Sequence, residues 1–191
     1  MPQNVELKAR LESLTKAERV AREIATERLG TEWQVDTYFV VPHGRLKLRE
    51  IRRQPHSSDR GRTPAIESQA TLIGYVRSDT VAAKLSDYRL IDVPDPVALK
   101  ETLSAALGVR CVVSKRREIF LHGQVRIHLD AVERLGAFIE FEAVLAPGYD
   151  DAAGHAQVSE LSRRFEIDGT QRIDVSYVDL LTAKDLLQSG G

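Results

Sequence analysis

Five segments of this sequence place charged residues at alternate positions, and this pattern most restricts how the chain can fold. In NVELKARL (4–11), polar and apolar residues alternate without interruption. The same alternation runs through RLKLRE (45–50), VVSKRREIF (112–120), QVRIHLDAV (124–132) and GAFIEFEAV (136–144). Because successive side chains of a strand point to opposite faces, each segment predicts a half-buried strand with one charged face.

The rest of the sequence predicts further strands with helices between them. A helix is expected from Thr15 to Gly30, with Thr15 as N-cap, Glu18 completing a capping box and Gly30 as the C-terminal cap. A second is expected over 95–108, where an aspartate precedes a proline and a glycine ends the pattern. The other expected elements are strands at 33–41, 66–79 and 86–94 and helices at 155–167 and 177–187. Together, these elements predict an α+β fold with about eight mainly antiparallel strands.

The segment 52–64 is polar, rich in arginine and turn residues, and lacks periodicity, so it is predicted to be a mobile loop. Its basic residues are Arg52, Arg53, Arg60 and Arg62. They suit either a basic lid that attracts anions or an ordinary solvated loop.

Composition limits the class of protein that carries these strands. The chain has 191 residues, 42% of them hydrophobic, which is enough for one core, so we expect a single domain over 1–191. A formal net charge of −1 argues against general attraction to nucleic acid or to an anionic membrane. The single cysteine excludes an intrachain disulfide, and neither a signal peptide nor a membrane-spanning apolar run is visible, so we expect a cytoplasmic protein.

The charged strand faces are compatible with two arrangements. On an open sheet they would face water while helices cover the apolar face. In a closed eight-stranded barrel they would point inward around a small ligand. Buried basic residues would then need an anionic partner, since unpaired buried charge costs several kcal/mol. Neighbouring carboxylates would offer the oxygen ligands that Mg²⁺ or Mn²⁺ requires, so the barrel predicts a polyphosphate site.

Four segments stand out in this order: VELKARL (5–11), DTYFVVPHGRLKLRE (36–50), VSKRREIFLHGQVRIHLDAVERLGAFIEFE (113–142) and SYVDLL (176–181). Together they resemble the CYTH superfamily of triphosphate tunnel metalloenzymes, and most closely its class IV adenylyl cyclase-like proteins. The resemblance runs from Asn4 to about Leu181. It implies an eight-stranded antiparallel β-barrel or tunnel with a charged interior and helices outside, holding a triphosphate with Mg²⁺ or Mn²⁺.

The resemblance also implies which residues form the site. The triphosphate would be bound by Lys8, Arg45, Lys47, Arg49, Arg77, Lys115, Arg117 and Arg126. The metal would be held by Glu6, Asp130, Glu140 and Glu142, and the catalytic residues would be Lys8, Arg117, Asp130 and Glu140. His128, which shares the parity of Arg126 and Asp130, suits either a general base or a hydrogen-bonding neighbour of the phosphates.

The first strand departs from the family pattern E-x-E-x-K, because Asn4 stands where the first glutamate is expected. Asparagine offers a neutral oxygen and removes one negative charge, which weakens divalent-ion binding. The sequence therefore leaves open whether the site takes one metal ion or two.

The leading functional interpretation is a class IV adenylyl cyclase-like enzyme that converts ATP to cyclic AMP and pyrophosphate. The alternative is a triphosphatase in which water attacks the γ-phosphorus of inorganic, thiamine or nucleoside triphosphate. A non-catalytic polyphosphate binder is a further alternative, and the near-neutral charge argues against a protein acting on RNA 5′-triphosphate ends. The expected partner is a small-molecule triphosphate, with no membrane partner, and the expected assembly is a monomer or a homodimer.

Overall fold

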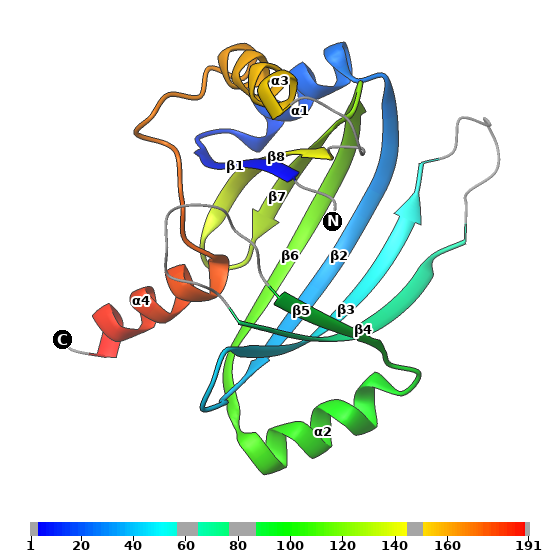
Figure 1. The fold of residues 1–191 in the computed structure, drawn as a ribbon, viewed down its shortest axis with the longest axis vertical. Helices are drawn as coiled ribbons and strands as arrows, with labels where there is room; N and C mark the ends of the chain where they lie inside the picture. The colour runs from blue at the N-terminus through cyan, green and yellow to red at the C-terminus, as the bar shows by residue number, and fades with distance from the viewer. Residues whose placement is uncertain (1–3, 57–64, 77–86, 145–150, 190–191) are drawn as a thin grey trace. The chain divides into compact units, whose positions relative to one another are not determined.

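The structure is a computed structural model that describes residues 4–56, 65–76, 87–144 and 151–189 (Figure 1). Its strands are β1 (Asn4–Leu11), β2 (Glu27–Phe39), β3 (Arg45–Pro55), β4 (Glu67–Val76), β5 (Asp87–Asp92), β6 (Val109–His122), β7 (Val125–Val132) and β8 (Gly136–Val144). Its helices are α1 (Leu14–Ile24), α2 (Pro96–Leu107), α3 (Asp151–Arg164) and α4 (Tyr177–Ser189). No helix in this part of the chain is long and apolar enough to cross a membrane.

The eight strands form one sheet in the order β1-β8-β7-β6-β2-β3-β4-β5. The pairs β1–β8, β7–β8, β6–β7, β3–β4 and β4–β5 are antiparallel. The α+β class and the eight-stranded antiparallel sheet expected from the sequence are therefore confirmed. The order makes neighbours of β1, β8, β7 and β6, which carry most of the charged alternation.

The chain divides into two compact units, which are described separately below. The first unit comprises Met1–Glu32, Gln54–Ala65 and Lys115–Val175, and the second comprises Trp33–Arg53, Ile66–Ser114 and Ser176–Gly191. The expectation of a single domain stays a prediction.

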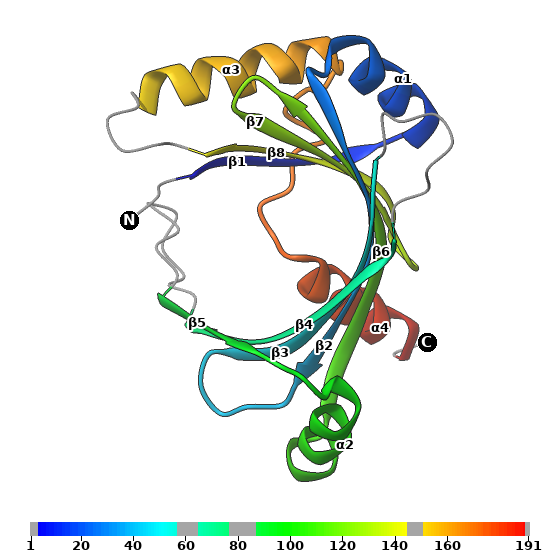
Figure 2. The ribbon, with the colours of Figure 1, turned by 90° about the vertical axis from the view of Figure 1, so that its right-hand side faces the viewer.

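The core of the first unit lies between the apolar strand faces and two helices. Figure 2 shows α1 and α3 along one side of β1, β7 and β8. The strands contribute the apolar residues predicted from the sequence. Ala17 and Ala21 come from α1, Val158 and Leu161 come from α3, and Phe165 directly follows α3. Because the two parities of a strand point to opposite faces, the charged parity of these strands lies on the face away from the helices.

In the second unit, α2 covers the apolar face of β2, β3 and β4 (Figure 2). Its residues Leu99, Leu103 and Leu107 recur every four positions and pack against Phe39, Leu48 and Ala70. The predicted caps of this helix are confirmed: the Asp95 side chain accepts a hydrogen bond from the Ala98 amide at 3.0 Å, and Gly108 adopts φ 77°. These contacts hold α2 on the face of the sheet opposite the one that carries Lys47 and Arg49.

The helix predicted from Thr15 to Gly30 exists, but both of its predicted ends were wrong. Ser13 is the N-cap, since its side chain accepts the Lys16 amide at 3.2 Å, and the helix stops at Ile24. Gly30 lies inside β2 at φ 134°. The helical propensity of 25–29 is overridden by strand pairing: the Thr26 amide donates to the Leu121 carbonyl at 2.7 Å and the His56 amide to the Leu29 carbonyl at 3.2 Å.

The first two arginines of the segment predicted to be a loop lie in a strand instead. Arg52 and Arg53 belong to β3, paired with Ser68 and Glu67 of β4. The guanidinium carbon of Arg52 lies 5.9 Å from the ring centroid of Trp33, a cation–π contact. The other two predicted lid residues, Arg60 and Arg62, lie outside the described residues.

Candidate functional site

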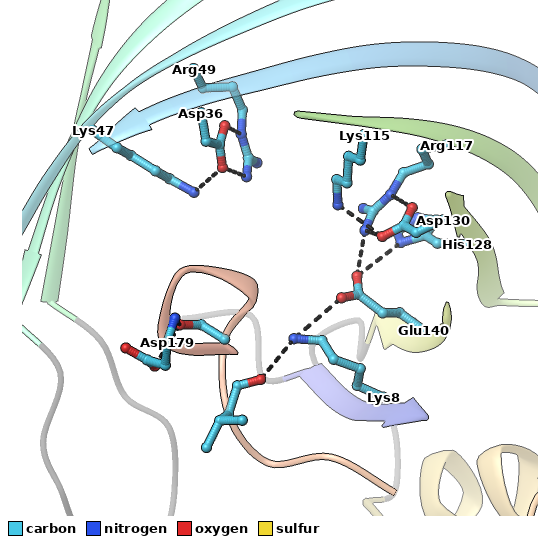
Figure 3. A network of polar contacts seen from close by, with 12 residues as sticks. Lys8, Asp36, Lys47, Arg49, Lys115, Arg117, His128, Asp130, Glu140 and Asp179 are labelled. Carbon is cyan, nitrogen blue, oxygen red and sulfur yellow. Dashed lines mark hydrogen bonds and ion pairs between the residues drawn. The ribbon is translucent and has the colours of Figure 1, made fainter. Parts of the chain in front are cut away.

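A row of polar side chains crosses β1, β8 and β7 on the face of the first unit opposite α1 and α3. Lys8 is opposite Glu140, and Glu140 is opposite His128. The Lys8 ammonium lies 3.4 Å from Glu140 Oε1, and His128 Nδ1 lies 3.9 Å from Glu140 Oε2. Lys8 also donates a hydrogen bond to the Val175 carbonyl at 3.4 Å (Figure 3). The Glu140 carboxylate is therefore shared between a lysine and a histidine.

The fully buried Asp130 of β7 (0% exposed) binds two cations of β6. Lys115 Nζ donates to Asp130 Oδ2 at 2.9 Å. Arg117 donates from Nε to Oδ1 and from Nη2 to Oδ2, each at 2.7 Å. Arg117 Nη2 also lies 2.5 Å from Glu140 Oε2 (Figure 3). Arg117 thus joins the Lys115–Asp130 pair to the row centred on Glu140.

The electrostatics of this cluster keep its acids ionised. Burial by itself would raise the pKa of Asp130, but Arg117 and then Lys115 outweigh it and hold that pKa below its usual value. The pKa of Glu140 lies well below normal because Arg117, His128, Lys115 and Lys8 outweigh the same effect of burial. Burial, reinforced by Arg117, lowers the pKa of His128, so its imidazole is neutral at pH 7 and can accept a proton.

A second row of charged residues lies one pleat further along the same strands. Glu6 of β1 is opposite Glu142 of β8, and Glu142 is opposite Arg126 of β7. Arg126 Nη1 lies 3.5 Å from Glu142 Oε2. Like charges directly opposite one another on neighbouring strands destabilise a sheet, and a cation that both carboxylates can ligate relieves that repulsion.

The donor chemistry of Glu6 and Glu142 fits a hard divalent cation, with Glu140 two residues from Glu142 on the same face. In the described parts of the chain, no three acidic, histidine or cysteine side chains form a group that could hold a metal as they stand. Lys115 and Arg117 engage both oxygens of Asp130, and Lys8 and Arg117 engage both oxygens of Glu140, so a metal ion at either acid would have to share it with these cations.

The second unit contains a similar buried cluster on β2 and β3. Asp36, which is 6% exposed, accepts Lys47 Nζ at 2.7 Å on Oδ2. Arg49 donates from Nε to Oδ1 and from Nη2 to Oδ2 of Asp36, each at 2.7 Å (Figure 3). Lys47 Nζ also lies 3.4 Å from the Tyr38 hydroxyl and 5.3 Å from its ring centroid.

Arg45, another predicted phosphate ligand, is engaged at the start of α4 in the second unit. Its Nη1 donates to Ser176 Oγ at 2.9 Å, and its Nη2 lies 3.0 and 3.1 Å from the two carboxylate oxygens of Asp179. Arg45 and Ser176 lower the pKa of Asp179 against the opposing effect of its partial burial. The segment SYVDLL therefore supplies an acid that pairs with one of the predicted cations.

The structure thus places the predicted residues in two groups. The first unit brings together Lys8, Lys115, Arg117, His128, Asp130 and Glu140, beside the row of Glu6, Glu142 and Arg126. The second unit brings Lys47 and Arg49 together on Asp36.

Two residues that the sequence analysis singled out are not fully described by the structure. Arg77 lies outside the described residues. The backbone of Asn4 pairs with Val144, while its side chain is outside the description.

Sequence reasoning missed Asp36 and Asp179. A sequence signal for Asp36 was present, because it is a charged residue inside the segment 33–41, which was predicted to be a strand. Asp179 carried no such signal, since an acid in the first turn of a helix is common for reasons of helix stability alone.

The sequence of this chain matches the CYTH domain family over residues 2–177, which is most of its length. The chain belongs to the CYTH family. Proteins of this family typically act on triphosphates and depend on a metal ion. No curated protein matches the chain significantly.

Solved structures support the CYTH fold of this chain. The PH1819 protein of Pyrococcus horikoshii OT3 is 22% identical, with a TM-score of 0.70, over 95% of this chain and 99% of that one. The PH1012 protein of the same organism is 21% identical, with a TM-score of 0.69, over 93% and 99%. A "putative adenylate cyclase" from Vibrio parahaemolyticus is 22% identical, with a TM-score of 0.65, over 94% and 98%. At these identities the likeness concerns the fold alone.

Proposed function

We propose that this CYTH protein is a divalent-metal-dependent enzyme that acts on a triphosphate, with conversion of ATP to cyclic AMP and pyrophosphate as the leading reaction. The observation that carries the proposal is the charged face of the first unit, opposite α1 and α3. There Lys115 and Arg117 lie in the same cluster as Glu140, while the opposed carboxylates Glu6 and Glu142 occupy the adjoining row. Phosphate oxygens need such cations, and a metal ion needs such acids.

Each group has a role that follows from its charge. Lys8, Lys115 and Arg117 bind phosphate oxygens and neutralise the charge that develops in the transition state. The remaining predicted cations that we assign to phosphate binding are Arg45, Lys47, Arg49, Arg77 and Arg126. Asp130 holds Lys115 and Arg117 in place through the hydrogen bonds to both of its oxygens.

Glu6, Glu140 and Glu142 would hold Mg²⁺ or Mn²⁺, which supplies further charge neutralisation on the phosphates. The low pKa of Glu140 suits a ligand, because a metal binds the ionised carboxylate. With Asn4 in place of the family glutamate, we propose that this acid set binds at least one ion.

In the cyclase reaction the ribose 3′-oxygen bonds to the α-phosphorus, and the bond from that phosphorus to the bridging oxygen of the β-phosphate breaks. Pyrophosphate leaves, and the proton of the 3′-hydroxyl must be accepted. His128 is the proposed acceptor, because its lowered pKa keeps it neutral within the charged row. Two structural neighbours, from Vibrio parahaemolyticus and Bacillus halodurans, are named adenylate cyclases with the qualifier "putative". Their names support cyclic AMP formation as the leading reaction.

The triphosphatase alternative uses the same groups. Lys8, Lys115 and Arg117 recognise the charge of the phosphates and not a base or a sugar. They can therefore bind a triphosphate equally well when water attacks the γ-phosphorus and orthophosphate leaves.

A product assay separates these reactions. ATP, thiamine triphosphate and inorganic triphosphate are offered separately with Mg²⁺ or Mn²⁺, and products are resolved by phosphorus NMR and chromatography. Cyclic AMP with pyrophosphate supports the leading proposal, orthophosphate supports the alternative, and tight binding without turnover would make the protein a binder.

The Glu140→Gln variant tests the site in the same assay. Removing one ionised ligand should lower turnover by roughly 100-fold and weaken the dependence on metal concentration. The control is Glu160→Gln, which makes the same chemical change at an exposed position paired with Arg164. Equal turnover in the two variants would contradict the role of Glu140.

A further inference from the structure

The same arrangement of a lysine, an arginine and an aspartate occurs in each compact unit. In the second unit, the Lys-x-Arg sequence at 47–49 on β3 binds Asp36 of β2. In the first unit, the Lys-x-Arg sequence at 115–117 on β6 binds Asp130 of β7. In both, the aspartate belongs to the strand that neighbours the basic one in the sheet.

The two clusters agree atom by atom. Each arginine donates from Nε to Oδ1 and from Nη2 to Oδ2 at 2.7 Å. Each lysine donates to Oδ2, at 2.7 Å for Lys47 and 2.9 Å for Lys115. Both aspartates are buried, at 6% and 0% exposed. Such a two-bond fork holds the guanidinium plane and the lysine chain in one orientation.

An aspartate in a phosphate-binding site is unexpected on charge alone. Asp36 cancels one of the two positive charges of Lys47 and Arg49, so a neutral residue would leave a stronger field for an anion. The carboxylate offers a different advantage. It orders two flexible side chains when the protein folds, so that less side-chain entropy is lost when a ligand binds.

We propose that Asp36 is a positioning residue that holds Lys47 and Arg49 in the orientation that binds the phosphate groups of the triphosphate, as the counterpart of Asp130 in the other unit. This inference rests on the proposed function, which assigns Lys47 and Arg49 to phosphate binding. It adds a residue whose own charge opposes the ligand that it helps to bind.

The ionisation of Asp36 is constant over the working pH range. Burial by itself would raise the pKa of Asp36, but Arg49 and then Lys47 outweigh burial and hold that pKa far below its usual value. The two hydrogen-bonded cations are therefore ordered at neutral pH whether or not a ligand is present.

The Asp36→Asn variant separates positioning from simple electrostatics by the sign of its effect. If Asp36 positions the cations, the variant binds inorganic triphosphate about tenfold more weakly in calorimetry, although its site has gained one unit of positive charge. If Asp36 acted only as a counter-charge, binding would tighten. The control is Asp92→Asn on β5, which removes the same charge at an exposed position of the same unit. Unchanged or tighter binding by Asp36→Asn, relative to this control, overturns the proposal.

A double-mutant cycle tests whether Asp36 acts through its partners. In a Lys47→Met, Arg49→Met background, adding Asp36→Asn should cause no further loss of triphosphate affinity. A loss equal to that in the wild-type background would show that Asp36 acts by another route, and would contradict the proposal.

A measurement without ligand keeps this inference separate from the proposed function. In NMR spectra of the unliganded protein, the Nε–H group of Arg49 should be ordered and protected from exchange, and Asp36→Asn should abolish that protection while the backbone spectrum shows an intact fold. Retained protection refutes positioning even if triphosphate binds. Failure of the wild-type protein to bind triphosphate while this signal behaves as expected would refute the proposed function, and the phosphate role of Asp36 with it.

Discussion

Replacing Asp130 with asparagine should lower the free energy of unfolding by about 3 kcal/mol at pH 7. The carboxylate is completely buried and accepts three charge-assisted hydrogen bonds from Lys115 and Arg117. The side chains of those two cations are themselves only 7% and 11% exposed. Asparagine keeps the shape of the residue and removes its charge, so two largely buried cations lose their common counter-ion.

The magnitude follows from what the variant leaves behind. Removing one partner of a buried ion pair costs roughly 3–5 kcal/mol, because the other charge stays buried without compensation. The lower end applies here, since Glu140 lies 2.5 Å from Arg117 and still compensates part of its charge. Against a typical domain stability of about 5–15 kcal/mol, the predicted loss is a large fraction of the total.

The assay is urea unfolding of both proteins, followed by circular dichroism between pH 3 and 8. Since the folded-state pKa of Asp130 is depressed, its stabilising contribution is complete above the usual aspartate pKa of 3.8 and is lost as the pH falls through the folded-state value. The difference between wild type and Asp130→Asn should therefore be constant from pH 5 to 8 and shrink in acid.

Glu160→Gln is the control for this prediction as well. Glu160 pairs with Arg164 at 2.8 Å, but both side chains are about half exposed, so the same acid-to-amide change should alter stability little. An Asp130→Asn loss no larger than that of the control, or a difference that grows as the pH falls from 5, would refute the reasoning.

Two further predictions concern local structure in the first unit. Ser13→Ala should lower the free energy of unfolding by about 1 kcal/mol, because it removes the N-cap of α1. Thr15→Ala should lower it clearly less in the same thermal-unfolding assay. A larger loss for Thr15→Ala would mean that Thr15 is the N-cap, as the sequence predicted. Gly30→Ala should cost roughly 2 kcal/mol or more by urea unfolding, because its φ is 134° and an added Cβ would lie 2.3 Å from the Gln54 carbonyl oxygen. Gly169→Ala, whose Cβ would meet nothing within 4 Å, should be nearly neutral, and equal losses in the two variants would contradict the steric argument.

Features that depend on a few neighbouring residues could be predicted from the sequence. The alternation at 4–11 and 136–144 predicted both the strands and their charged face, because side-chain direction in a strand depends only on position. Asp95, Pro96 and Gly108 predicted the ends of α2 correctly, because each acts on adjacent backbone groups.

The same local reasoning failed where distant strands compete with propensity. Residues 25–30 read as the end of a helix, yet their backbone pairs with β6 and with the residues that follow β3. Those partners lie far along the chain, so no local pattern signals their presence.

The sequence by itself determined that strands with one charged face would form and which residues would lie on that face. Only the tertiary structure decided which acid meets which base: Glu140 with Lys8 and Arg117, and Asp36 with Lys47 and Arg49. The physical reason is that alternation is a property of one strand. A charged cluster, by contrast, depends on strand order and register, which bring Lys8 opposite Glu140 across most of the chain.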